Sequence, residues 1–142
     1  MSERRVSVCR GMAIVIFVAL AMAGCGTARM YDGPERAPSE VAVIRPKSIL
    51  YGVKIVTVDE CETGMLDRGV EVLPGKHVVH AEASAAGAIG GTDMWLAYLT
   101  FEALAGHHYS VAAARTGAIN YVGWLWIEDD ADGSLVTGNR PD

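Results

Sequence analysis

The stretch VEVLPGKHVVHAEA, residues 70–83, decides the fold. Residues 70–73 and 76–83 are rich in valine, which suits a pleated strand, and the pair Pro74-Gly75 between them is a typical turn. This strand–turn–strand pattern has the period of two expected of a sheet and lacks the 3.6-residue period of an amphipathic helix. It therefore predicts an all-β fold.

The same pattern continues on both sides of this stretch. Leu99 and Phe101 share one face of a predicted strand, and Tyr109, Val111 and Ala113 share a face of the next. Residues 84–93 are nearly all alanine and glycine and predict a flexible loop. The whole pattern predicts a small antiparallel β-sandwich of seven or eight strands, with a small closed barrel as the alternative. The other predicted strands are residues 40–45, 50–58, 121–128 and 134–137.

The N-terminal residues have the three parts of a secretory signal. Three arginines within residues 2–10 precede an apolar run over residues 12–23, and small residues lead to Cys25. The residues before Cys25 resemble a bacterial lipobox. That resemblance implies that Cys25 is diacylated, that the signal is cut before it, and that the new amine is acylated. An uncleaved anchor helix or a fortuitous cysteine is the alternative.

This signal divides the chain into three parts. We expect a signal peptide at residues 1–24, a lipidated Cys25 followed by a flexible tether to residue 40, and a β-sandwich domain at residues 41–142. Gly33, Pro34 and Pro38 interrupt the tether, which has no apolar periodicity. A flexible segment of this length would hold the domain about 20 Å from the bilayer.

The charge of the chain limits its partners. The formal net charge is -5, and it becomes -7 without the signal, which holds three arginines and one glutamate. An acidic domain without a basic cluster argues against nucleic acid and against an electrostatic grip on anionic lipids. Membrane attachment must then come from acyl chains. By resemblance to sorted lipoproteins, Gly26 in place of a retaining aspartate predicts the outer membrane, facing the periplasm.

The cysteines predict no disulfide within the mature chain. Cys9 would leave with the signal and Cys25 would be consumed by lipidation, which leaves Cys61 alone. We expect Cys61 to be buried and inert, with pairing to another molecule as the alternative.

Several short motifs resemble those of a loose group of small proteobacterial lipoproteins, and the LPGKH turn is weakly similar to the PEGA type of surface β-domain. The resemblance implies a small sandwich held outside the cytoplasmic membrane. Each motif is a strand or turn signature and none is catalytic, so no functional residue is carried over. The motifs are YDGP (31–34), EVAVI (40–44), LPGKH (73–77), LTFEA (99–103), AGHHY (105–109) and WIED (126–129).

The histidines are the candidates for a metal site. Residues three apart or adjacent point to opposite faces of a strand, so neither His77 with His80 nor His107 with His108 can chelate locally. A site could form across strands from His77 and His107 with a nearby glutamate. We expect instead that these histidines are solvated or bond backbone carbonyls, and we predict no metal and no cofactor.

No catalytic motif is present in the sequence. Residues 129–133, DDADG, resemble a fragment of a calcium loop without its final glutamate, and we expect a turn there. The glycines fit neither a phosphate loop nor a dinucleotide fingerprint. We therefore predict a non-enzymatic interaction or structural module of the envelope, with a periplasmic metal or small-ligand binder using His77 and His107 as the alternative.

One strand could carry a partner-binding face. Alternation over residues 121–128 places Trp124, Trp126 and Glu128 on one face and Leu125 and Ile127 on the other. A sandwich has one core, so something must cover the second face. Either the tether or the alanine/glycine loop with Trp95 folds over Trp124 and Trp126, or these tryptophans dock another envelope protein.

Overall fold

The computed structural model describes residues 26–47, 50–64 and 67–142. The predicted signal peptide and Cys25 lie outside the described residues, as do Ser48, Ile49, Met65 and Leu66. Within the described ranges, no helix has the length and apolar content needed to cross a bilayer.

Strands dominate the described chain, with one 3-10 turn at Pro38–Glu40. The strands are β1 (Ala28–Arg29), β2 (Ala42–Pro46), β3 (Gly52–Val58), β4 (Cys61–Glu62), β5 (Val70–Val72), β6 (Gly75–Ala86), β7 (Thr92–Ala103), β8 (His108–Thr116), β9 (Val122–Asp129) and β10 (Leu135–Gly138).

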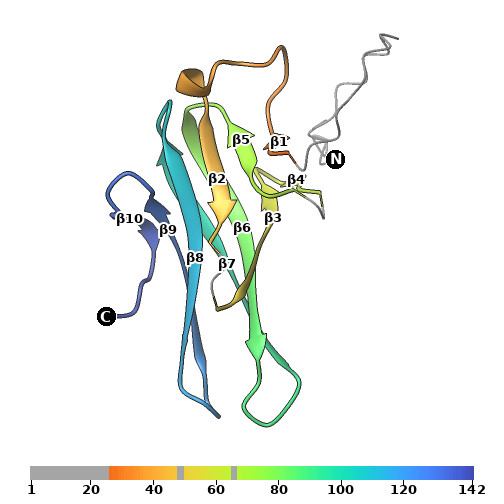
Figure 1. Ribbon diagram of the computed structural model, residues 1–142, viewed down its shortest axis with the longest axis vertical. Coiled ribbons are helices and arrows are strands. Elements are labelled where there is room, and N and C mark those ends of the chain that lie inside the picture. Colours follow the sequence, from red (N-terminus) through yellow and green to blue (C-terminus); the bar gives the residue numbers. More distant parts are fainter. Residues whose placement is uncertain (1–25, 48–49, 65–66) are drawn as a thin grey trace, which may run out of the picture.

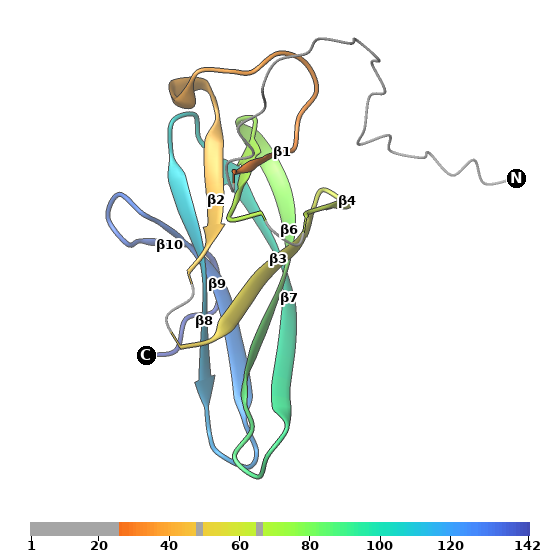
Figure 2. The same cartoon turned by 45° about the vertical axis from the view of Figure 1, so that its right-hand side comes forward.

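The strands form two sheets that pack against each other (Figures 1 and 2). One has six strands in the order β1-β5-β2-β8-β9-β10, and the other has four in the order β4-β3-β6-β7. The prediction of an all-β, two-sheet fold is confirmed. The expectation of purely antiparallel pairing is wrong, because β2 pairs in parallel with β8 and β1 in parallel with β5.

The stretch that predicted the fold joins the two sheets. The predicted strands are present as β5 and β6, but β5 lies in the six-stranded sheet and β6 in the four-stranded sheet. The turn at Pro74 and Gly75 therefore carries the chain across the core and does not close a hairpin. Gly75 has a φ of +135°, which side-chain-bearing residues rarely adopt, so glycine suits this crossing.

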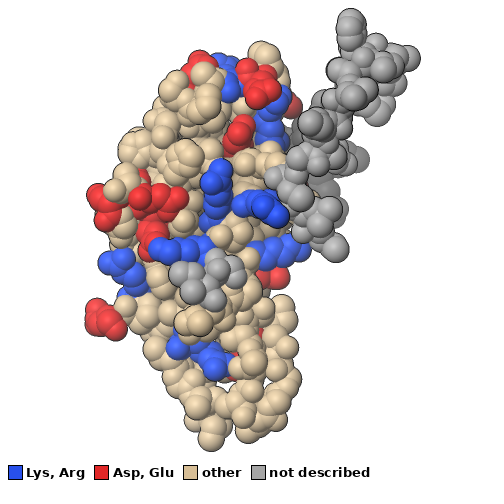
Figure 3. Space-filling view, viewed as in Figure 1, with Lys and Arg blue, Asp and Glu red and all other residues tan. Residues whose placement is uncertain are grey.

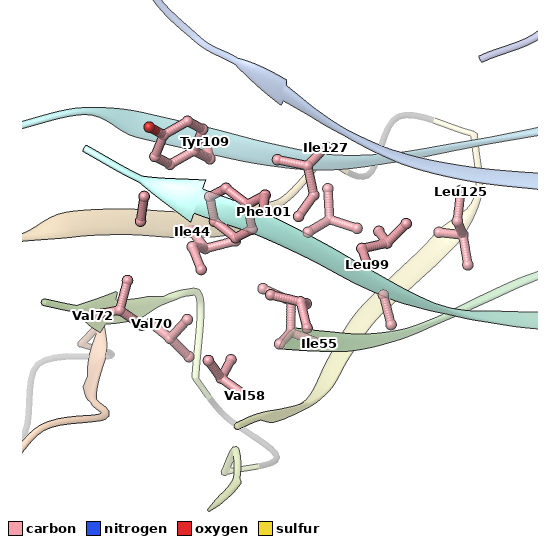
Figure 4. Packing of buried hydrophobic residues seen from close by; sticks show 14 of the residues in the cluster. Ile44, Ile55, Val58, Val70, Val72, Leu99, Phe101, Tyr109, Leu125 and Ile127 are labelled. Carbon is pink, nitrogen blue, oxygen red and sulfur yellow. The ribbon is translucent and has the colours of Figure 1, made fainter. Parts of the chain in front are cut away.

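Both sheets supply side chains to one core (Figure 4). Leu99 and Phe101 of β7 lie in the core with Tyr109 and Val111 of β8, and each pair shares a face of its strand, as the alternation predicted. The rings of Phe101 and Tyr109 meet edge to face, with centroids 5.0 Å apart. Val70 and Val72 of β5 complete this layer on the side of the first sheet.

Two strands depart from a simple alternation of core-facing and outward-facing residues. In β2 the core residues are Ala42 and Ile44, although Val41 and Val43 on the opposite face are also buried. In β3 the register to β6 shifts between Ile55 and Thr57. Such a bulge reverses which face the later side chains occupy, so Val58 enters the core.

Two residues of the segment expected to be a flexible tether, Ala28–Arg29, form β1 at the edge of the first sheet. The amides of Ala28 and Met30 donate to the carbonyls of Gly69 and Glu71, both over 2.9 Å. Both side chains also pack against the core. Without β1, the backbone groups along the outer edge of β5 would have no partner in the sheet. The short strand β1 pairs with them, so a long apolar strand is not needed.

The predicted loop over residues 84–93 is also shorter than expected. The ladder between β6 and β7 continues to the pair Ala86 and Thr92, so only residues 87–91 form the tip. Cross-strand pairing here outweighs the low strand propensity of alanine and glycine.

Cys61 differs from its prediction as well. It lies half-buried in β4, directly after a tight turn in which Asp59 and Glu60 both have positive φ, and it is disulfide-bonded. The other cysteines of the chain, Cys9 and Cys25, lie outside the described residues. The prediction of a buried, unpaired thiol is wrong: the turn places Cys61 at an edge of the second sheet, where it is only half-buried, and its sulfur is in a disulfide.

Candidate interaction site

The two faces of β9 are those that the sequence predicted. Leu125 and Ile127 lie in the core, and Trp124, Trp126 and Glu128 lie on the outer face of the six-stranded sheet. Trp126 is nevertheless only 8% exposed, and Trp124 is half-buried.

Trp126 and Glu128 form a polar cluster with Lys47. The indole N–H of Trp126 donates to Glu128 Oε2 over 3.0 Å, and Lys47 forms an ion pair with Glu128 Oε1. Burial would raise the pKa of Glu128, but the hydrogen bonds from Lys47 and Trp126, and the charges of Lys47 and Arg140, hold the pKa below its usual value. The carboxylate is thus ionised and already partnered.

Neither the described tether residues nor the alanine/glycine loop lines the pocket beside Trp126. Lys47, Leu50 and Tyr51, which precede β3, line a pocket of about 220 Å³ together with Trp126 and Glu128. Trp95 lies on the other side of β9 and packs toward the core, where its indole N–H donates to the carbonyl of Trp124 over 3.1 Å.

His77 is held by two contacts, one to the turn between β3 and β4 and one to the connection between β5 and β6. Its Nδ1 lies 2.6 Å from Asp59 Oδ2, and its Nε2 lies 2.7 Å from the carbonyl oxygen of Leu73. A metal ligand needs a free nitrogen lone pair, and both ring nitrogens of His77 already have partners.

His107 lies in the other sheet's connections. Its Nδ1 is 2.6 Å from Asp129 Oδ2, and its ring lies beside that of Tyr109. Burial raises the pKa of Tyr109, which the Leu104 amide opposes by donating to its hydroxyl, and the charge of Asp129 raises it further. His107 thus ties the start of β8 to the end of β9.

The sequence DDADG forms the turn between β9 and β10, as predicted. The amide of Gly133 donates to the carbonyl of Asp129, and Asp132 accepts from the amide of Ser134. Hydrogen bonding to the Ser134 side chain, and then to its amide, lowers the pKa of the exposed Asp132. Across the described ranges, no three histidine, cysteine, aspartate or glutamate side chains are placed to hold a metal ion.

The outer face of β7 presents an apolar stripe that the sequence reasoning missed. Met94, Leu96 and Tyr98 are exposed by 60%, 58% and 68%. We call these three residues the β7 stripe. Tyr98 stacks on His80 of β6 with ring centroids 4.5 Å apart, so the stripe continues onto the neighbouring strand.

The end of the molecule next to the stripe carries no charge. Residues 84–92 and 116–127, which include the tips of the β6–β7 and β8–β9 hairpins, contain no charged side chain. Ile89 and Ile119 at these tips are exposed by 92% and 78%. Figure 3 shows charged side chains over the upper and middle parts of the molecule and none at the lowest end.

The β7 stripe could have been predicted from the alternation of residues along this strand. Because side chains alternate along a strand, the shared face of Leu99 and Phe101 implies that Met94, Leu96 and Tyr98 lie on the opposite face. Outward apolar residues on a strand that also carries an apolar inner face indicate a surface that something else covers.

Comparisons with protein-family models, with curated proteins and with solved structures found no match to this chain.

Proposed function

We propose that this chain is a lipid-anchored protein of the bacterial envelope that works as a non-enzymatic interaction or structural module. Cys25 would carry the acyl chains, and the domain would face the periplasm from the outer membrane. The observation that carries the proposal is the β7 stripe.

The stripe has the chemistry of a docking surface. Exposed apolar side chains that lie singly need no explanation, but three in succession on one strand face form a contiguous patch. Methionine and tyrosine are enriched at protein interfaces, where tyrosine supplies a large contact area at low entropic cost. Because charges are absent from residues 94–101, covering the patch would desolvate no ionised group of this segment.

The start of the chain supports a fixed arrangement at the membrane. Ala28, three residues after Cys25, already lies in β1. A lipid on Cys25 would therefore hold the domain close to the bilayer surface without a long linker. Figures 1 and 2 place β1 in the half of the molecule away from the hairpin tips, so the uncharged end would point away from the anchoring bilayer.

The second candidate is a small-ligand binder, and the pocket beside Trp126 favours it. Its polar groups are Lys47 and Glu128, which neutralise each other. A metal binder using His77 and His107 is the corresponding alternative from the sequence. A thermal shift on adding zinc or copper, lost in His107→Ala, would favour that alternative over the docking surface.

The docking surface is tested by crosslinking in intact cells. A photo-crosslinking amino acid is placed at Leu96 in the full chain, and in a matched control at Leu135, which is 46% exposed in β10. We expect a specific adduct from position 96 and none from position 135. Absence of an adduct at position 96, with normal amounts of folded protein, would contradict the proposed function.

A further inference from the structure

Three of the four sheet edges among the described residues are protected against pairing. β1 and β4 have two residues each, and β10 has four and a register shift against β9. Short strands and bulges are the usual devices that keep sheet edges from binding other chains.

β7 is the fourth edge and has none of these devices. It is twelve residues long and pairs with β6 without any register shift. It contains no proline, and its only charged residues are Asp93 and Glu102 near its two ends. Asp93 is already bound by Arg115 over 2.5 Å. No described strand pairs with its second edge.

The backbone groups on this edge belong to the stripe residues. The hydroxyl of Tyr121 in the β8–β9 connection donates to the carbonyl of Met94 over 3.0 Å, which indicates that this carbonyl points away from β6. In an antiparallel ladder such groups alternate along the strand, so those of Leu96 and Tyr98 point to the same side. A carbonyl has two lone pairs, and Met94 can accept a second bond.

The outward side chains of β7 are chemically symmetric about Leu96. In order they are Thr92, Met94, Leu96, Tyr98 and Thr100. An antiparallel copy centred on Leu96 would pair threonine with threonine, methionine with tyrosine, and leucine with leucine. Such cross-strand pairs stabilise sheets, and this register sets no two like charges opposite each other.

We propose that β7 pairs antiparallel with β7 of a second copy of this chain, about a two-fold axis at Leu96. The two four-stranded sheets then form one continuous sheet, in which the β7 stripes of both copies lie side by side on one face and contact each other across the new strand pair. A two-fold contact of this kind uses the same patch on both subunits and closes on itself. This inference rests on the proposed function and names the partner of the same surface.

Charges beside the stripe favour a protein over a lipid surface. Lys54 and Glu82 lie in the same row of the sheet as Leu96, on neighbouring strands. A bilayer laid on this face would have to desolvate both. Edge pairing leaves Lys54 and Glu82 on the open face, two and one strands away from the contact.

The test uses two differently tagged copies of the full chain, expressed together, with the photo-crosslinking amino acid at Leu96 of one copy. We expect an adduct that carries both tags. An adduct of one tag with another protein would overturn the self-pairing and leave the docking function standing. An absence of any adduct, relative to the control at Leu135, would overturn both.

A charge at the axis provides a second test. Leu96→Lys places two lysines directly opposite each other, so we expect co-purification of the two tagged copies in mild detergent to fall at least about tenfold. Leu135→Lys should leave it unchanged. Because Leu96 is exposed, the variant should keep the thermal unfolding of the parent, and equal co-purification of both variants would overturn the proposal.

Discussion

Glu128 is the buried charge whose removal has the clearest predicted cost. Glu128→Gln removes the ion pair with Lys47 and weakens the bond from Trp126. Hydrogen bonds to charged groups contribute about 1.5–3 kcal/mol, so we expect a loss of about that size at pH 7, measured by urea unfolding. Glu102→Gln, at an exposed position of β7, is the matched control and should change little.

The same carboxylate predicts a pH dependence. The pKa of Glu128 is lower in the folded chain than its ordinary value of 4.5. Its stabilising contribution is therefore complete above that value and is lost as the pH falls through the lower folded pKa. The difference between the parent and Glu128→Gln should shrink in this acid range, and a difference that stays constant from pH 7 to pH 3 would contradict the assignment.

Gly123 is required by close packing against Trp95. A Cβ at this position would lie 2.3 Å from the Trp95 ring, which is fixed between the sheets. We expect Gly123→Ala to destabilise the fold by about 1–3 kcal/mol in denaturant unfolding. Gly52→Ala is the control, because the single close contact of its Cβ would be with the hydroxyl of Ser84, which can rotate away, and the Ser84 carbonyl oxygen lies at an ordinary 3.8 Å.

At the scale of residues, the sequence predicts which face of a strand a side chain occupies better than it predicts how deeply that side chain is buried. It placed Trp126 and Glu128 on the face opposite Ile127 correctly, because alternation depends only on the local chain. It could not show that Trp126 lies beside a pocket lined by Lys47 and Tyr51, because these residues are distant from it in sequence. For the same reason the partners of His77 and His107 were not predictable.

At the scale of elements, the pairing of β1 with β5 tests whether residues 28–30 are ordered or form part of a flexible tether. The amides of Ala28 and Met30 are hydrogen-bonded to β5, so we expect them to exchange with deuterium much more slowly than the exposed amide of Asp32. Met30→Ala should also lower the free energy of unfolding by about 1–2 kcal/mol, because Met30 packs on the core. Glu35→Ala, in an exposed part of the same segment, should not. Fast exchange at the amides of both Ala28 and Met30 would contradict this pairing and support a flexible tether.

Strand positions were predictable where valine and aromatic residues alternate, as in β6 to β9. Sheet membership was not, because the turn after β5 can either close a hairpin or cross between sheets, and local propensity is the same in both cases. The bulge in β3 could not be predicted from the sequence for a related reason. Its position is set by the partner β6, and nothing within the strand marks it.

At the scale of the whole molecule, the anchor is the first prediction. Cys25→Ser should abolish fatty-acid labelling and leave unprocessed precursor, because the acylated thiol is the substrate of the next processing step. Labelled protein of mature size in that variant would contradict the lipobox assignment. Density-gradient fractionation of the parent should place it with outer-membrane markers, and recovery with the inner membrane would contradict the interpretation of Gly26.

At this scale the all-β, two-sheet fold was predictable from the sequence, but the position of the β7 stripe at a sheet edge was not. Length and period-two patterning suffice for a small two-sheet domain. The β7 stripe depends on which strand lies at an edge, and strand order follows from contacts between distant parts of the chain. Only the structure shows that the long strand with an uncharged centre, β7, is the one without a second neighbour among the described residues.

The pairing of the β7 edge is tested most directly by hydrogen exchange of the mature protein in mild detergent at two concentrations. The peptide over residues 94–101 holds the outward amides of Leu96 and Tyr98. We predict slow exchange of these amides in concentrated protein and fast exchange on dilution, while the core amides of β8 stay protected throughout. Exchange over residues 94–101 that is equally fast at both concentrations would contradict the account.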